Sequence, residues 1–266
     1  MILCLDIGNT QLYGGLYKED KVIYRFRKAM SKGISSDEIG IFLRSVIKEN
    51  GFDPSRIERI AYCSVVPDVN HSLTNACRHY FNLEPFSLKP GVKTGLKIKY
   101  TNPGEVGADR IADAIGAYTR YPDQNIIIVD FGTATTFDVL TKDREYLGGA
   151  IAPGMKISMQ SLEERTAKLP KVEIIKPTRT CGKTTIESIQ SGLYYGTLGM
   201  VKEITQSITK QNFKGEKPLI IGTGGFAGLY RDSGVFDEIL PDLVLDGIYT
   251  AQQLNIPPVK GLLEAD

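Results

Sequence analysis

The chain has 266 residues, of which 42% are hydrophobic and 24% are charged, and its 32 basic and 31 acidic residues leave a net charge of +1. This composition is typical of a globular protein with one large or two similar domains. The balanced charge provides no general attraction to nucleic acid or to an anionic membrane surface, so we expect neither partner and any anion site has to be local.

The four cysteines form no CxxC pair and the chain has two histidines, a pattern that argues against a structural zinc site and a disulfide framework. The sequence opens on a strand-like segment, Ile2–Leu5, without a signal-peptide pattern, and contains no apolar run of membrane-spanning length. We therefore expect a cytoplasmic protein with reduced thiols.

The first element is Leu3–Gly15, LCLDIGNTQLYGG, in which an apolar run ends at Asp6 and a polar turn follows. The same pattern returns at Ile127–Val139, IIVDFGTATTFDV, with its carboxylate at Asp130. Turns of Gly, Thr and Asn let backbone N–H groups approach an anion, whereas a carboxylate beside phosphate requires a cation between them. The repetition favours two turns that hold a metal-bound polyphosphate; for either copy alone, an ordinary hairpin is the alternative.

The rest of the first half alternates short strands and helices, which indicates parallel strands covered by helices. In chain order we expect a hairpin over 11–17 and 21–26, and then a helix with a capping box at 35–38, an amphipathic run over 39–47 and an end at Gly51. A strand over 59–65, a helix over 67–81, and short strands over 86–88 and 96–100 follow.

The stretch Asn102–Tyr118, NPGEVGADRIADAIGAY, predicts a helix that starts near Pro103 and has one face of small residues. Such a face permits close approach of another helix or of a ligand. Asp109 beside Arg110 offers a base and a carboxylate anchor. The alternative is a solvated helix face on which Arg110 pairs with Asp113.

The second half continues with a strand over 145–152, a GGAIAPG segment over 148–154 and helices over 155–167, from Thr184 or Thr185, and over 241–254. Gly182-Lys183-Thr184 resembles the end of a Walker A loop, but Pro177 stands where that motif needs Gly. The segment 218–230 reads as strand, glycine turn and helix, and formally fits a dinucleotide-binding motif. Because it comes too late for a full doubly wound sheet, we favour an adenosine contact there.

Six motifs in order resemble the type III pantothenate kinases, within the acetate and sugar kinase, Hsp70 and actin superfamily. They are DIGNT at 6–10, PGEVGADR at 103–110, DFGTATTFD at 130–138, GGAIAPG at 148–154, ESIQSG at 187–192 and TGG at 223–225. The resemblance implies an α/β fold of duplicated actin-like (ribonuclease H-like) domains with mixed β-sheets flanked by helices, an ATP site in the cleft between them, and a homodimer with active sites near the interface. We place the domains at 1–117 and 118–255, with a tail over 256–266.

The activity that the resemblance implies is ATP-dependent phosphorylation of the primary hydroxyl of pantothenate, the first step towards coenzyme A. It gives Asp109 the role of catalytic base and Asp130 that of ligand to K⁺ or NH₄⁺, with Asp6 near Mg²⁺. The implied ATP contacts are Asp6, Ile7, Gly8, Asn9, Thr10, Gln11, Leu12, Tyr13 and Thr133. The implied pantothenate contacts are Tyr100, Gly107, Ala108, Asp109, Arg110 and Thr185.

Asp113 departs from the family pattern, where we expect Asn, and would raise the pKa of Asp109 by like-charge repulsion unless Arg110 offsets it. Three alternatives stay open. They are a non-catalytic accessory relative, an actin-fold phosphotransferase or phosphatase with another substrate, and a binding protein of the same fold.

Overall fold

The computed structural model describes residues 1–166 and 168–256, and the chain divides into two compact units. Unit 1 comprises Met1–Leu96, Asn102–Thr119 and the chain from Val244 on, whereas unit 2 comprises Lys97–Thr101 and Arg120–Leu243. The contacts thus group the C-terminal helix with unit 1. The predicted domain boundary at residue 117 stays a prediction, and the predicted tail lies, apart from Ile256, outside the described residues.

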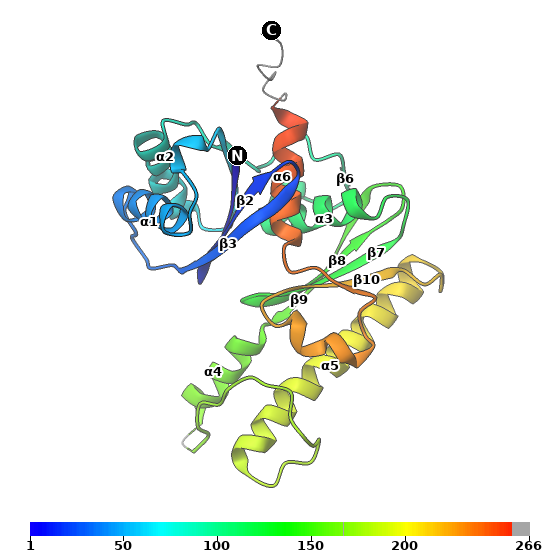
Figure 1. The fold of residues 1–266 in the computed structure, drawn as a ribbon. Coiled ribbons are helices and arrows are strands. Elements are labelled where there is room, and N and C mark those ends of the chain that lie inside the picture. The colour runs from blue at the N-terminus through cyan, green and yellow to red at the C-terminus, as the bar shows by residue number, and fades with distance from the viewer. Residues whose placement is uncertain (167, 257–266) are drawn as a thin grey trace. The chain divides into compact units, whose positions relative to one another are not determined.

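Unit 1 contains a five-stranded sheet in the order β3-β2-β1-β4-β5 (Figure 1). Its central strand pairs antiparallel with β2 and parallel with β4. Two helices cover each face of this sheet. The strands are β1 (Ile2–Ile7), β2 (Gln11–Lys18), β3 (Lys21–Ala29), β4 (Arg59–Ser64) and β5 (Phe86–Ser87), and the helices are α1 (Ser36–Glu49), α2 (Pro67–Phe81), α3 (Ala108–Arg120) and α6 (Leu243–Asn255).

The alternation of residues along β1 decides which helices meet which face. Leu3, Leu5 and Ile7 point into a core shared with α1 and α2, whereas Cys4 points into a second core shared with α3 and α6. Asp6, two residues after Cys4, belongs to the second face. The polar end of the strand is thereby placed beside α3.

Helix α1 begins where its capping box predicts. The Ser35 hydroxyl accepts a hydrogen bond from the Glu38 amide at 3.2 Å, and the Glu38 carboxylate accepts one from the Ser35 amide at 2.9 Å. At the other end of the helix, Gly51 has a φ of +83°, as expected for a glycine that ends a helix.

The predicted start of α3 is wrong by several residues. Pro103–Glu105 form a separate 3₁₀ turn, η2, whose first residues are capped by the Asn102 side chain. Val106 has an extended backbone with a ψ of 126°, which interrupts the helical path. Helix α3 therefore begins only at Ala108.

The small-residue face of α3 receives another helix. An added Cβ on Gly247 of α6 would lie 1.7 Å from the carbonyl oxygen of Ala112, so the two backbones touch directly. Of the two predicted occupants of this face, the structure places a helix at Ala112. Arg110 and Asp113 are buried, with 8% and 3% exposure, and the solvated-face interpretation of this pair is wrong.

Unit 2 contains a six-stranded sheet in the order β11-β10-β7-β8-β9-β6. Its elements are β6 (Lys97–Ile98), β7 (Ile126–Phe131), β8 (Ala134–Leu140), β9 (Glu145–Pro153), β10 (Leu219–Gly224), β11 (Glu238–Ile239), α4 (Met155–Arg165), α5 (Thr185–Asn212) and the 3₁₀ helix η3 (Ala227–Ser233). Side chains of β7 in this sheet pack with side chains of α5 and η3 to form the core of unit 2. The predicted helix after the Gly222–Gly225 turn is the 3₁₀ helix η3, which Gly234 ends in a left-handed conformation.

The two units repeat one strand arrangement. In unit 1 the order is β3-β2-β1-β4-β5, and in unit 2 the corresponding order is β9-β8-β7-β10-β11. In both, the central strand has an antiparallel hairpin partner on one side and a parallel strand on the other. The duplicated α/β architecture with mixed sheets and flanking helices is confirmed. No helix in residues 1–166 and 168–256 is both long and apolar enough to cross a membrane.

Candidate active site

Asp6 stands in a row of side chains that crosses four strands of unit 1. Strand pairing places Tyr13 opposite Asp6, Arg27 opposite Tyr13, and Cys63 opposite Asp6 on the other side. The Arg27 guanidinium lies 3.8 Å from the centroid of the Tyr13 ring, and the Cys63 thiol donates a hydrogen bond to Asp6 Oδ1 at 3.3 Å. The row holds the carboxylate between an aromatic side chain and a thiol.

The turn after Asp6 divides the predicted ATP-binding run into buried and exposed residues. The amide of Gly8 donates to the carbonyl of Gln11 at 3.0 Å and closes the turn. Ile7, Leu12 and Tyr13 are buried, with at most 6% exposure, and so anchor the hairpin. Asn9, Thr10 and Gln11 are exposed at its tip, where a ligand has access.

Asp109 lies in the first turn of α3, on the helix that covers the Asp6 face of the sheet. Its Oδ1 accepts a hydrogen bond from the backbone amide of Arg110 at 2.8 Å. Gly107 leaves room for this carboxylate, because an added Cβ there would lie 2.4 Å from Asp109 Oδ1. A helix N-terminus carries partial positive charge, which stabilises an ionised carboxylate.

The pKa values of both carboxylates are raised, and the charge of Asp109 contributes to the rise at Asp6. Burial, followed by the charge of Asp109, raises the pKa of Asp6 to about 7, and the Cys63 hydrogen bond and Arg27 act in the opposite direction. Burial also raises the pKa of Asp109, while the Arg110 amide and charge lower it. The expected rise at Asp109 is present, but its cause is burial and not the charge of Asp113. A pair of desolvated carboxylates is typical of a functional site.

Burial raises the pKa of the Cys63 thiol well above its usual value, and the neighbouring Asp6, Asp109 and Asp113 add to that rise. The thiol therefore keeps its proton and serves Asp6 as a donor.

In unit 2, Asp130 occupies the corresponding end of β7 between two glycines. An added Cβ on Gly132 would lie 3.2 Å from Asp130 Oδ2, and one on Gly224 would lie 2.1 Å from Asp130 Oδ1. Gly224 also has a φ of +83°, which residues other than glycine rarely adopt. Asp130 Oδ1 therefore packs against Gly224 of the TGG motif, and Oδ2 packs against Gly132 of the turn after β7.

The turn that carries Thr133 is held by the end of the GGAIAPG segment. The amide of Gly154 donates to the carbonyl of Thr133 at 3.2 Å, and an added Cβ on Gly154 would lie 2.3 Å from that oxygen. At the start of the segment, Tyr100 packs so closely on Gly148 that an added Cβ would lie 2.9 Å from its ring. The glycines thus serve close packing around Thr133 and Tyr100.

Thr185 is the first residue of α5, after the cap formed when Thr184 Oγ1 accepts from the Glu187 amide at 3.2 Å. It is exposed and lines a groove of about 700 Å³ between α4 and α5. The groove is otherwise mostly apolar, with Pro153, Ile157 and Leu193 in its wall.

The predicted site residues thus form two sets. Unit 1 brings together the phosphate turn over 6–13 and the segment 107–110, and unit 2 contains Tyr100, Asp130, Thr133 and Thr185. Sequence reasoning missed Cys63 and Arg27. The register between β1 and β4 would have revealed Cys63, because the pairing of Ile2 with Arg59 places Cys63 beside Asp6.

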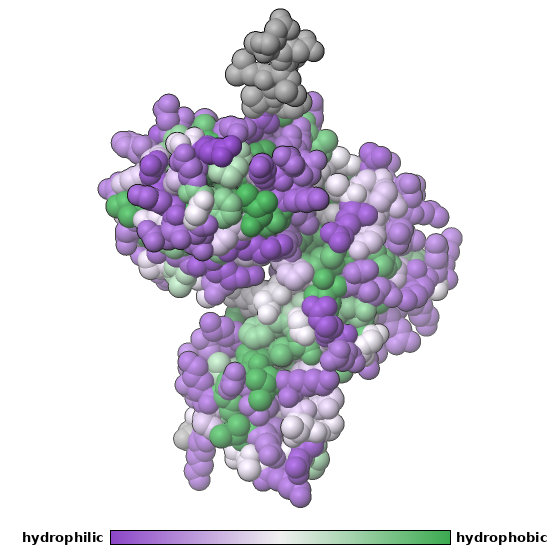
Figure 2. Space-filling model, viewed as in Figure 1, coloured by the Kyte–Doolittle hydropathy of each residue, from purple (hydrophilic) through white to green (hydrophobic). Residues whose placement is uncertain are grey.

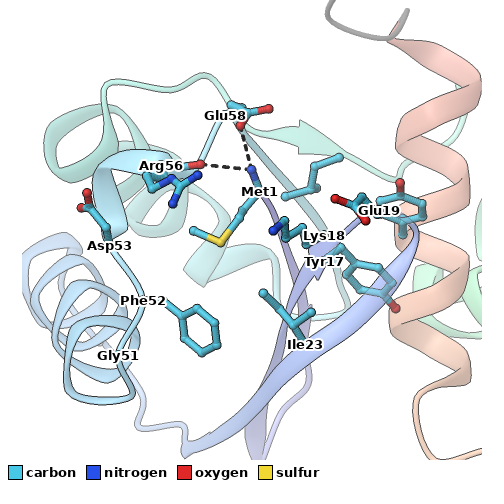
Figure 3. Close-up of a pocket in the computed structure, with 12 residues that line it drawn as sticks. Met1, Tyr17, Lys18, Glu19, Ile23, Gly51, Phe52, Asp53, Arg56 and Glu58 are labelled. Carbon is cyan, nitrogen blue, oxygen red and sulfur yellow. Dashed lines mark hydrogen bonds and ion pairs between the residues drawn. The ribbon is translucent and has the colours of Figure 1, made fainter. Parts of the chain in front are cut away.

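A second cavity, of about 580 Å³, lies in unit 1 and contains none of the predicted site residues (Figure 3). The N-terminal ammonium lies at its edge, where it donates to Glu58 Oε1 at 2.8 Å and to the carbonyl of Arg56 at 3.0 Å. Its charged side chains are of both signs, including Lys18, Arg56, Asp53 and Glu58, so it has no net preference for an anion or a cation.

The described residues contain no group of three or more His, Cys, Asp and Glu side chains that could hold a metal ion. Each unit instead has one half-buried carboxylate at its predicted phosphate turn, Asp6 in unit 1 and Asp130 in unit 2. Divalent cations that enter with a nucleotide are commonly held by one or two carboxylates plus phosphate oxygens. The residues present fit that mode of binding.

The repeated strand order of the two units defines an actin-like ATPase fold, which sugar kinases share. Over its whole length the chain matches a candidate 2-dehydro-3-deoxygalactonokinase from Sinorhizobium meliloti, covered completely, with a TM-score of 0.58 and 13% identity. A candidate Baf family transcriptional activator from Campylobacter jejuni has a TM-score of 0.56 and 20% identity, with coverage of 94% of this chain and 97% of that one. At such identities these structures establish the fold alone.

The family is established by sequence. Residues 2–207 match the family model for type III pantothenate kinase. A type III pantothenate kinase from Legionella pneumophila (strain Corby) is 55% identical over 255 residues, which cover 96% of this chain and 99% of the relative. The chain belongs to the type III pantothenate kinase family. Kinases transfer a phosphoryl group from a nucleotide that is bound together with a divalent cation.

Proposed function

We propose that this protein phosphorylates the primary hydroxyl of pantothenate with ATP and releases 4′-phosphopantothenate and ADP, the first step of coenzyme A biosynthesis. The observation that carries the proposal is the pairing of Asp6 and Asp109 in unit 1. One carboxylate stands at a phosphate-type turn, and the other stands at a helix start with a raised pKa. A kinase needs such a cation-binding carboxylate and a base.

Asp109 is the general base of this proposal. It accepts the proton of the pantothenate hydroxyl as the oxygen forms a bond to the γ-phosphorus and the bond from that phosphorus to ADP breaks. A raised pKa makes Asp109 a better proton acceptor than an exposed aspartate. The segment that we assign to pantothenate also contains its neighbours Gly107, Ala108 and Arg110. Arg110 supplies positive charge for the carboxylate or an amide of pantothenate.

Asp6 would hold Mg²⁺, directly or through water, and the exposed tip of the turn would supply amides and hydroxyls to the ATP phosphates. Mg²⁺ would neutralise charge on the transferred phosphate. Asp130 would hold K⁺ or NH₄⁺ in the corresponding turn, with Thr133 as a further ATP contact. The strand register supports this assignment, because Asp130 is the last residue but one of β7 and faces β8 as Asp6 is the last but one of β1 and faces β2.

We further propose that the protein forms a homodimer through the α4–α5 face of unit 2. Figure 2 shows hydrophobic residues gathered between these helices. Ile157 and Leu162 of α4, which are 41% and 36% exposed, line the groove between the helices, and Thr185, a proposed pantothenate contact, lines the same groove. Exposed apolar surface of this kind is typical of an interface. Light scattering should report twice the chain mass, and a single-chain mass would contradict the dimer.

The activity is tested by ADP release from purified protein with ATP and Mg²⁺, with and without pantothenate, in K⁺ and then in Na⁺. We expect release that depends on pantothenate and falls when Na⁺ replaces K⁺. Release without pantothenate would indicate a different phosphotransferase or a hydrolase, and no release in any salt would favour the accessory-protein alternative.

A further inference from the structure

We propose that Cys63 is a positioning residue for Asp6, whose thiol fixes one oxygen of the carboxylate so that the other faces the cation of the bound nucleotide. This inference rests on the role proposed above for Asp6. Its basis is the hydrogen bond from Cys63 Sγ to Asp6 Oδ1 at 3.3 Å.

The backbone makes this contact a fixed feature of the sheet. Strands β1 and β4 run parallel, and their register pairs Asp6 with Cys63 at the end where both strands stop. The following residue, Ser64, closes the turn after β4, because its Oγ accepts from the Val66 amide at 3.1 Å. Cys63 is fully buried, so its side chain has little freedom to turn away.

The arrangement explains how a carboxylate stays oriented beside a second carboxylate. The charge of Asp109 acts on Asp6, and Arg27 acts on it from the far side of the Tyr13 ring. Neither effect fixes the rotation of the Asp6 carboxylate about its own bond, whereas a directed hydrogen bond does. Because Oδ1 accepts the hydrogen bond from the Cys63 thiol, Oδ2 is the oxygen left to a ligand.

A thiol is a weak hydrogen-bond donor, so the expected contribution is modest. Removing it should weaken nucleotide binding in the presence of Mg²⁺ by about three- to tenfold, the range expected for one hydrogen bond. A hydroxyl at the same position keeps a donor. Cys63→Ser should therefore stay within about twofold of wild type, whereas Cys63→Ala should not.

Packing loss is separated from positioning by a matched variant. Cys77 is also fully buried in unit 1, but it lies in the core on the other face of the sheet, with α1 and α2. Cys77→Ala therefore removes the same atoms without touching the Asp6 row. Thermal unfolding of each variant measures the stability loss that either substitution causes.

The test is calorimetric binding of a nonhydrolysable ATP analogue to the full chain, with Mg²⁺ and again with EDTA. We expect weaker binding for Cys63→Ala with Mg²⁺, near-normal binding for Cys63→Ser and Cys77→Ala, and no difference among the variants in EDTA. Equal binding by Cys63→Ala and Cys63→Ser, a defect that persists in EDTA, or a wild type that does not bind the analogue would overturn the inference.

This experiment does not depend on phosphoryl transfer. If wild type fails to phosphorylate pantothenate but the Cys63 variants differ as expected, the proposed function is wrong and the positioning role stands. If wild type turns over pantothenate and the variants bind alike, the proposed function stands and the positioning role is wrong.

Discussion

Asp6 and Asp109, 103 positions apart in the printed sequence, lie close enough in unit 1 for the charge of Asp109 to raise the pKa of Asp6, second only to burial. Strand β1 supplies one carboxylate and helix α3 the other. Two half-buried like charges close together cost free energy, and a bound cation would lower that cost. The two carboxylates therefore favour binding of a cation beside them.

Asp109→Asn should lower kcat by about 10²- to 10⁴-fold, the usual cost of losing a general base, and leave the fold intact. Steady-state kinetics with pantothenate and ATP measure this loss. Glu105→Gln is the matched control, because Glu105 is an exposed carboxylate on the segment just before α3. A variant Asp109→Asn with nearly full kcat would refute the role of base.

The raised pKa of Asp6, about 7 against an ordinary 3.8, predicts a pH dependence of stability. The folded chain binds this proton more tightly than the unfolded chain, so the stabilisation is complete below about pH 4 and is lost as the pH rises through about 7. The nucleotide-free protein should therefore unfold at a lower temperature at pH 8 than at pH 5.

Asp6→Asn should flatten this difference and raise stability at pH 8 by about 1–2 kcal/mol while impairing Mg-ATP binding. Thermal unfolding of both proteins across this pH range measures it, and parallel curves would contradict the assignment.

Gly224→Ala should displace the Asp130 carboxylate, because the new Cβ would lie 2.1 Å from Oδ1 and the φ of +83° disfavours any side chain. We expect the ratio of turnover in K⁺ to turnover in Na⁺ to fall towards one, with a stability loss of about 1–2 kcal/mol. Gly228→Ala is the control, since a Cβ there meets nothing within 4 Å. An unchanged cation ratio in Gly224→Ala would separate Asp130 from the monovalent ion.

Gly247→Ala tests the contact between α6 and α3. Alanine normally stabilises a helix interior by about 1 kcal/mol relative to glycine. Here the added Cβ would lie 1.7 Å from the Ala112 carbonyl oxygen, and because backbone cannot rotate away, we expect a net loss of about 2–3 kcal/mol in denaturant unfolding. Gly199→Ala in α5, where a Cβ meets nothing within 4 Å, should show the ordinary gain. Equal gains in both would show that the helices separate without cost.

Much of this structure could be predicted locally. The repeated Asp-x-Gly turns indicated the duplicated hairpins, and the Ser35 capping box located the start of α1. The start of α3 was misplaced because Pro103 is compatible with a 3₁₀ turn as well as with an α-helix, and only the extended backbone at Val106 decides between them.

The site was harder to predict than the fold. The Cys63–Asp6 contact depends on the register between strands that lie more than fifty residues apart, which no local pattern reports. The effect of Gly224 on Asp130 likewise depends on pairing of β7 with β10. Sequence motifs indicated which carboxylates matter, but their surroundings are set by long-range strand pairing.

The central claim is tested most directly by ³¹P NMR of a reaction that contains the protein, Mg-ATP, K⁺ and pantothenate. We predict a new phosphate monoester resonance, coupled to the protons of a CH₂ group, that grows with ADP and is absent without pantothenate or with Asp109→Asn. Conversion of ATP to ADP and inorganic phosphate with no such ester would contradict the assignment of this protein as a pantothenate kinase.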